Sequence, residues 1–77
     1  MTYYIPEHNL EQLETRINLL TRAQYRKTGQ PRPTDVSVQM AAEDLYDDHG
    51  IPIADAKRII TGFAIESARR IALENPV

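Results

Sequence analysis

Residues 53–71 have the sequence IADAKRIITGFAIESARRI, the most apolar helical pattern in this chain. Apolar positions recur at spacings of three and four, and further apolar residues widen the stripe beyond half of the circumference. Such a helix is usually central, touching two neighbouring helices or a second chain. The pattern predicts a helix over residues 52–74, with Pro52 in its first turn. The stripe comprises Ile53, Ala56, Ile60, Phe63, Ser67 and Ile71, broadened by Ile59, Ala64, Ala68 and Ala72.

Two shorter amphipathic patterns precede this helix. The first predicts a helix over residues 6–28, in which Asn9 and Gln12 fit a capping box and Gly29 follows the last turn. The second predicts a helix over residues 34–49, capped by Thr34 or Asp35 and followed by Gly50. Residues 30–33 contain two prolines and form a stiff connector between them. The inward face of the second helix would be Val38, Ala41, Ala42 and Leu45.

The whole chain, residues 1–77, is therefore predicted to be one all-α domain of three helices. Residues 1–5 precede the first helix as a short strand, an arm or a disordered end. The candidate core or dimer residues are Leu13, Ile17, Leu20, Leu45, Ile60, Phe63 and Ile71.

At 77 residues the chain is near the lower size limit for independent folding. It has no cysteine, and His8 and His49 are too few for a closed structural metal site. The remaining sources of stability are very good helix packing or a partner chain. We favour a homodimer, either intertwined or packed through its helices, with the third helix at its centre.

Nearly the whole chain resembles the YejL-like family of small bacterial proteins. The matching motifs are residues 10–13 (LEQL), residues 33–38 (PTDVSV), residues 53–58 (IADAKR) and Phe63-Ala64. The connector is longer in this chain, and Phe63 is about two positions out of register. The resemblance implies a helical homodimer and assigns no activity.

A second resemblance is to the helical hairpin of histone-like HU and integration-host proteins. It covers Leu45, Gly50-Ile51, residues 55–57 (DAK) and Phe63. Because no sequence for DNA-holding arms follows the hairpin as far as Val77, the resemblance implies a way to dimerise and not a way to bend DNA. A ribbon-helix-helix repressor is disfavoured, because the distance from Pro6 to Gly29 is too long for its first helix.

The net charge of −2 hides two opposed blocks. Residues 16–32 carry five basic residues and no acid, whereas residues 33–49 carry five acids and no Lys or Arg. We expect the blocks to face each other, within or between chains. Arg26, Lys27 and Arg32 would lie near Asp35, and the other acids of the second helix would turn outward or pair with bases of the third helix, namely Lys57, Arg58, Arg69 or Arg70.

The end of the first helix and the connector form a basic elbow. One interpretation is contact with an acidic partner or with phosphates. The other is that these cations serve the helix dipole and solubility. The candidate partner-binding residues are Arg22, Tyr25, Arg26, Lys27 and Arg32.

The sequence contains few residues that could act together as a nucleophile and a general base. Neither Ser37 nor Ser67 has a histidine nearby in sequence, and Asp47, Asp48 and His49 point in different directions on a helix. We therefore expect no catalytic, cofactor or metal site. The absence of a signal-peptide pattern or an apolar run of spanning length favours a cytoplasmic protein without a membrane partner. The expected function is non-enzymatic interaction or regulation, with a nucleic-acid-associated regulator as the alternative.

Overall fold

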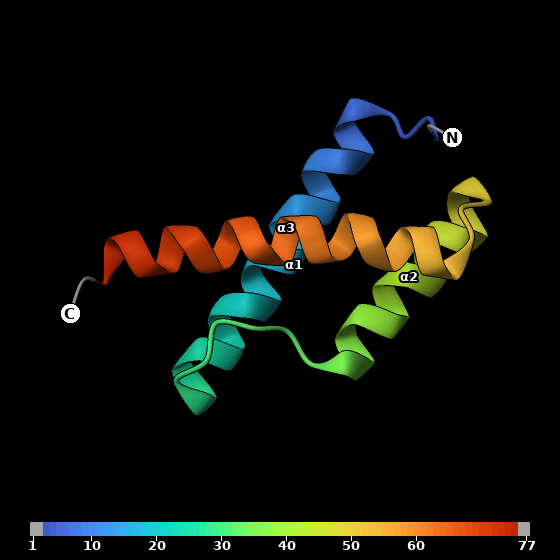
Figure 1. Cartoon of the computed structure of the whole chain (residues 1–77). Helices are drawn as coiled ribbons and strands as arrows, with labels where there is room; N and C mark the ends of the chain where they lie inside the picture. Colours follow the sequence, from blue (N-terminus) through green and yellow to red (C-terminus); the bar gives the residue numbers. More distant parts are fainter. Residues whose placement is uncertain (1–2, 76–77) are drawn as a thin grey trace.

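The computed structural model describes residues 3–75 and has three helices: α1 Glu7–Thr28, α2 Asp35–His49 and α3 Ile53–Glu74 (Figure 1). No strand occurs between residues 3 and 75. The prediction of an all-α fold of three helices is confirmed. Within the same residues, no helix combines the length and the apolar composition that crossing a membrane requires.

α3 lies across both other helices, and Figure 1 shows it passing in front of α1 and α2. It packs against each of them, whereas α1 and α2 make few contacts with each other. This position explains the wide apolar stripe of α3, because one part of its circumference is covered by α1 and another by α2. Two helices of the same chain therefore account for most of the stripe, although Phe63 is only half-buried and Ala72 is exposed.

The core lies where α3 meets α1, α2 and the loop between α2 and α3. Ile17, Ile51 and Ile60, one from each of α1, this loop and α3, are completely buried. Two of the candidate core residues, Leu20 and Phe63, are only half-buried at the margin of the core. The other five are buried: Leu13, Ile17, Leu45, Ile60 and Ile71.

The ends of α1 and α2 follow from two glycines and a threonine. Gly29 and Gly50 have φ angles of 80° and 68°, in the left-handed region that glycine adopts without strain. Their N–H groups donate to the carbonyl oxygens of Tyr25 and Tyr46, which closes the last turn of each helix. At the start of α2, Thr34 Oγ1 accepts a hydrogen bond of 3.1 Å from the N–H of Ser37. The expected cap at Thr34 is thus present.

The start of α1 differs from the sequence prediction. The N-cap is Pro6, whose side chain makes no capping bond, and its carbonyl oxygen accepts from the N–H of Leu10 at 3.0 Å. Asn9 already lies inside the helix, so it cannot have the non-helical backbone that a capping residue needs. The Gln12 side chain instead bonds to His8 at 3.2 Å. The expected capping box of Asn9 and Gln12 is therefore wrong.

The described part of the N-terminal segment packs onto the core. Ile5 is 8% exposed and belongs to the core cluster, although the sequence analysis did not assign it there. Tyr3 packs against the same cluster. Residues 3–6 have no strand, so of the three alternatives for residues 1–5 the structure shows a packed arm from Tyr3 onward. Met1 and Thr2 lie outside the described residues.

Candidate interaction site

The five residues of the basic elbow do not form one surface. Arg22 is half-buried, and its guanidinium bonds to Glu74 Oε2 at 2.5 Å and to Asn18 Oδ1 at 3.2 Å. It therefore fastens α1 to the end of α3. Tyr25 is also half-buried, and its carbonyl oxygen accepts the N–H of Gly29. These two residues hold the end of α1 in place.

The hydrogen bond from Arg22 lowers the pKa of Glu74 below its ordinary value. The positive charges of Arg22 and Arg70 act in the same direction. A carboxylate that stays ionised over a wider pH range keeps this contact intact over the same range. The structure thus assigns Arg22 a place in an ion pair within the chain.

The other three basic residues remain available. Arg26, Lys27 and Arg32 are exposed, and none of them forms an ion pair with any residue from 3 to 75. The sequence analysis expected Arg26, Lys27 and Arg32 to lie near Asp35, but none of the three forms an ion pair with it. The only acid of α2 with an ion pair in the described chain is Asp44, which meets Arg16 of α1 at 2.6 Å.

The acids of α2 were expected to turn outward or to pair with bases of α3, and among the residues described the first alternative is the one present. Arg58 and Arg69 pair with Asp55 and Glu66 of their own helix, and Arg70 pairs with Glu14 of α1. The reason is the crossing of α3 over both neighbours, which brings its C-terminal half to α1 rather than to α2 (Figure 1). Asp35, Glu43, Asp47 and Asp48 are exposed and make no ion pair with residues 3–75.

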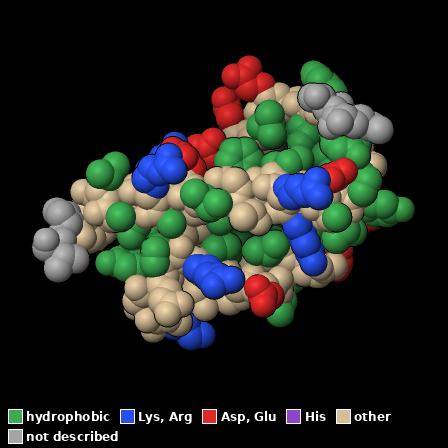
Figure 2. Space-filling view, in the orientation of Figure 1, with side chains coloured by type: hydrophobic (Ala, Val, Ile, Leu, Met, Phe, Trp, Pro, Cys, Tyr) green, Lys and Arg blue, Asp and Glu red, His purple; other side chains and the backbone are tan. Residues whose placement is uncertain are grey.

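A groove of about 380 Å³ lies between α3 and the connector of residues 29–34. We call it the connector groove. In Figure 2, hydrophobic side chains gather along the lower edge of α3, between this helix and the connector. Arg32 and Asp35 lie among its lining residues, so one cation and one anion flank an apolar floor. The full lining is Pro31, Arg32, Pro33, Asp35, Val38, Thr61, Ala64, Ile65 and Ala68.

The connector holds its part of this groove in a fixed shape. Pro33 is buried and Pro31 is half-buried, and a proline has only one accessible range of φ. The N–H of Arg32 donates to the carbonyl oxygen of Gln30 at 2.9 Å, which fixes the turn between them. The groove therefore needs little reorganisation before a partner binds.

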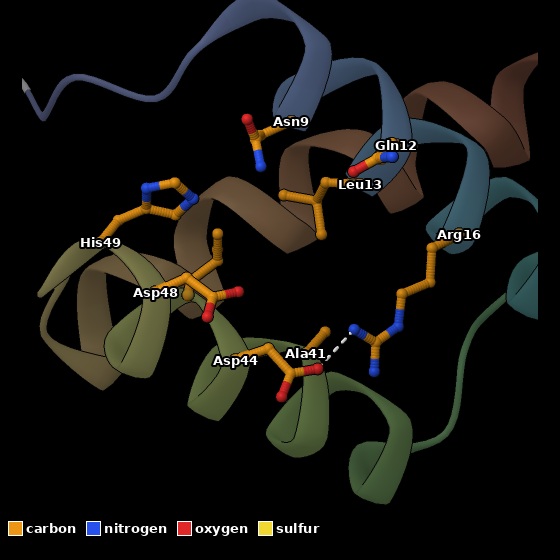
Figure 3. A pocket seen from close by; sticks show the side chains of 9 residues that line it. Asn9, Gln12, Leu13, Arg16, Ala41, Asp44, Asp48 and His49 are labelled. Carbon is orange, nitrogen blue, oxygen red and sulfur yellow. Dashed lines mark hydrogen bonds and ion pairs between the residues drawn. The ribbon is translucent and has the colours of Figure 1, made fainter.

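A second, more polar cleft of about 240 Å³ separates the first half of α1 from the second half of α2 (Figure 3). Its floor is Leu13, Ala41 and Leu45. Figure 3 shows Asn9, Gln12 and Arg16 on one wall and Asp44, Asp48 and His49 on the other, with the Arg16–Asp44 ion pair across the cleft.

The chemistry of this cleft is that of a solvated gap between two helices. Across residues 3–75, no three His, Asp or Glu side chains lie close enough to hold a metal ion. His49 makes no side-chain hydrogen bond to another described residue, and its neighbour Asp48 is exposed. We therefore place the candidate interaction site at the exposed cations and the connector groove.

Sequence reasoning missed most of the connector groove. The prolines were interpreted only as a stiff connector, and Ile65 lies off the inward stripe of α3, so the analysis left it unassigned. A single exposed apolar residue is common on protein surfaces, so its position alone gave no signal. The spatial meeting of the connector with α3 depends on tertiary packing and had no local signal.

Comparison of this chain with family models, with curated proteins and with solved structures gives no match. The resemblances described above stay expectations, and the candidate site is argued from the geometry of this chain.

Proposed function

We propose that this chain is a small non-enzymatic interaction protein that works as a homodimer and presents helical surfaces to another macromolecule. The observation that carries the proposal is the pair of exposed, unpaired cations Arg26 and Lys27 at the end of α1, in a chain whose other arginines on the helices all have ion pairs within the described residues.

The rigid backbone around Arg26 and Lys27 favours the binding of a partner by these two side chains. Gly29 ends α1 with a closed turn, and the buried Pro33 fixes the connector that follows. Arg22 ties the same part of α1 to Glu74 of α3. Cations on a fixed frame lose less conformational freedom on binding than cations on a mobile loop, so more of their attraction appears as affinity. An acidic protein segment is the partner chemistry that suits them.

The arrangement of the potential catalytic groups supports a non-enzymatic function. Ser37 belongs to the cap of α2, where its hydroxyl accepts a hydrogen bond from Thr34 at 2.8 Å. Ser67 is 2% exposed on the inward side of α3. His8 bonds to Gln12, and His49 lies across the polar cleft from Asn9 (Figure 3). Neither serine has a histidine as a hydrogen-bond partner within residues 3–75, so the nucleophile and base of a hydrolase are not brought together.

Whether the chain forms a homodimer can be tested by unfolding at equilibrium. Mass action makes the unfolding midpoint of a dimer rise with protein concentration, whereas that of a monomer does not change. Thermal unfolding across about a hundredfold dilution, combined with light scattering, separates the two cases. A monomeric mass with a constant midpoint would remove the dimer from the proposal.

The elbow is tested by charge reversal with a matched control. The variant Arg26→Glu/Lys27→Glu and the control Lys57→Glu/Arg58→Glu change the net charge equally, and the control alters the start of α3, outside the connector groove, instead of α1. We expect affinity capture from the host, with mass spectrometry, to lose specific proteins with the first variant and keep them with the control. The same set captured by both variants would contradict the role of Arg26 and Lys27.

The alternative, a nucleic-acid-associated regulator, draws on the same exposed cations. With Arg26, Lys27 and Arg32, a dimer has about six basic contacts, enough for a clear fall of affinity with salt. The net charge of −2 opposes tight binding. Capture that disappears after nuclease treatment, together with a nanomolar Kd for DNA or RNA at physiological salt, would favour this alternative.

A further inference from the structure

One of the residues that line the connector groove is a large apolar side chain that remains exposed. Ile65 stands at the edge of the groove and is 55% exposed, although it is one of the largest side chains on α3. Four residues before it is Thr61, three after it is Ala68 and seven after it is Ala72, so all four share one side of the helix. Thr61, Ala68 and Ala72 are small, so Ile65 protrudes beyond them, while Arg69, four residues after Ile65, carries a charge beside it.

The rim of the groove carries opposite charges. Arg32 and Asp35 are both exposed, both line the groove, and neither has an ion pair in the described chain. An acidic partner segment would be attracted by Arg32 and repelled by Asp35, and a basic segment would meet the reverse. A rim with one charge of each sign matches a copy of itself when the two are turned by a twofold rotation.

We propose that the connector groove is the surface on which a second copy of this chain packs. Around a twofold axis beside Ile65, the Ile65 of each copy enters the groove of the other. Arg32 then faces Asp35 of the partner subunit, and the same pair forms again on the opposite side of the axis. This proposal deepens the homodimer of the proposed function and rests on it, and it leaves Arg26 and Lys27 to a third molecule.

The surface that such an interface would need is a modest part of the chain's total. A stable interface buries about 800 Å² on each partner. The surface of this chain is 5479 Å², so the interface would cover roughly a seventh of it. The exposed side of α3 from Thr61 to Ala72, the connector and the first turn of α2 form a continuous surface around the groove.

The first test uses the absence of cysteine from the chain. In an Ile65→Cys variant, two sulfurs beside the axis form a disulfide under mild oxidation, because this bond needs Cα atoms within about 7 Å. The control is Leu19→Cys, at a similarly exposed position on α1 outside the groove. At protein concentrations above the dissociation constant of the dimer we expect rapid, nearly complete cross-linking at position 65, and only slow cross-linking by random collision at position 19.

The second test measures the dimer itself. Ile65→Glu places a charge in the apolar groove of the partner subunit and should weaken dimerisation by about a hundredfold or more. Leu19→Glu is the matched control and should leave the dissociation constant unchanged. Arg32→Asp should weaken the dimer, and the charge exchange Arg32→Asp/Asp35→Arg should recover most of the loss. Circular dichroism verifies that each variant is folded, which the exposure of the substituted side chains favours.

The outcomes separate the two proposals. A wild-type chain that is monomeric at all concentrations overturns both the homodimer and this surface, while the elbow is still judged by its own charge reversal. A wild-type dimer that Ile65→Glu does not weaken, with equal cross-linking at positions 65 and 19, overturns this surface alone. If Ile65→Glu fails to fold, the cysteine pair decides the same question.

Discussion

The hydroxyl of Tyr3 donates a hydrogen bond of 2.7 Å to Asp55 Oδ2, which joins residues 52 positions apart. The other oxygen of the same carboxylate accepts from Arg58 at 3.3 Å. With Ile5 buried two residues later, this bond fastens the N-terminal arm to the start of α3. The hydrogen bond to Asp55 raises the pKa of Tyr3 above its ordinary value, and partial burial and the negative charge of Asp55 add to the effect.

The raised pKa predicts a loss of stability at alkaline pH. The folded state holds the phenol proton of Tyr3 more tightly than the unfolded state does, so stability falls with rising pH. The contribution is complete below about pH 10, the ordinary value for tyrosine, and is lost as the pH passes the raised pKa. In a Tyr3→Phe variant this contribution is absent. Urea unfolding at pH 8, 10 and 11 should show a smaller decline for the variant, and equal declines would contradict the role of the bond.

Burial ranks the core substitutions. Ile60 is completely buried, so Ile60→Ala should cost about 3–4 kcal/mol of the free energy of unfolding. Phe63 is the larger side chain, but it is half-buried and remains partly hydrated in the folded state, so Phe63→Ala should cost only about 1–3 kcal/mol. Chemical denaturation of both variants at one protein concentration measures the order. A larger loss for Phe63→Ala would mean that its ring is covered in the assembled protein.

The ends of the helices show how far local signals reach. Gly29, Gly50 and Thr34 act within one turn of their own position, and the expected conformations are present. The capping box of Asn9 and Gln12 was equally plausible as a local pattern. It failed because Pro6, three residues earlier, already has the fixed φ and the free carbonyl oxygen that begin a helix.

Longer-range features could be predicted only in outline. The apolar width of α3 indicated a central helix, which the structure shows. The pairing of Arg16 with Asp44 and of Arg22 with Glu74 depends on how α3 crosses its neighbours, and no spacing along the chain encodes that angle. For the same reason the sequence identified the basic elbow but not its division between Arg22, which is paired, and Arg26 with Lys27, which are free of ion pairs among residues 3–75.

The cap of α2 gives a direct comparison with the absent capping box of α1. Thr34→Ala removes the oxygen that accepts the N–H of Ser37 and should cost about 1 kcal/mol. Asn9→Ala removes a side chain with no capping bond and should change stability by less than about 0.5 kcal/mol. Thermal or urea unfolding of the two variants measures the difference. A loss of about 1 kcal/mol for Asn9→Ala would mean that Asn9 does cap α1, contrary to the structure.

The ion pairs of the structure predict which pairs of charged residues have a measurable coupling energy. Arg16 and Asp44 are 2.6 Å apart with side chains that are 39% and 57% exposed, so a double-mutant cycle with Arg16→Ala and Asp44→Ala should give a coupling energy of about 0.3–1 kcal/mol at low salt. High salt should reduce it, because exposed charges are screened. The same cycle for Arg26 and Asp35 should give a coupling indistinguishable from zero at both salt concentrations, since no ion pair joins them. A clear low-salt coupling between Arg26 and Asp35 would mean that the elbow is neutralised by its own chain, and the attraction of Arg26 for an acidic partner would fall accordingly.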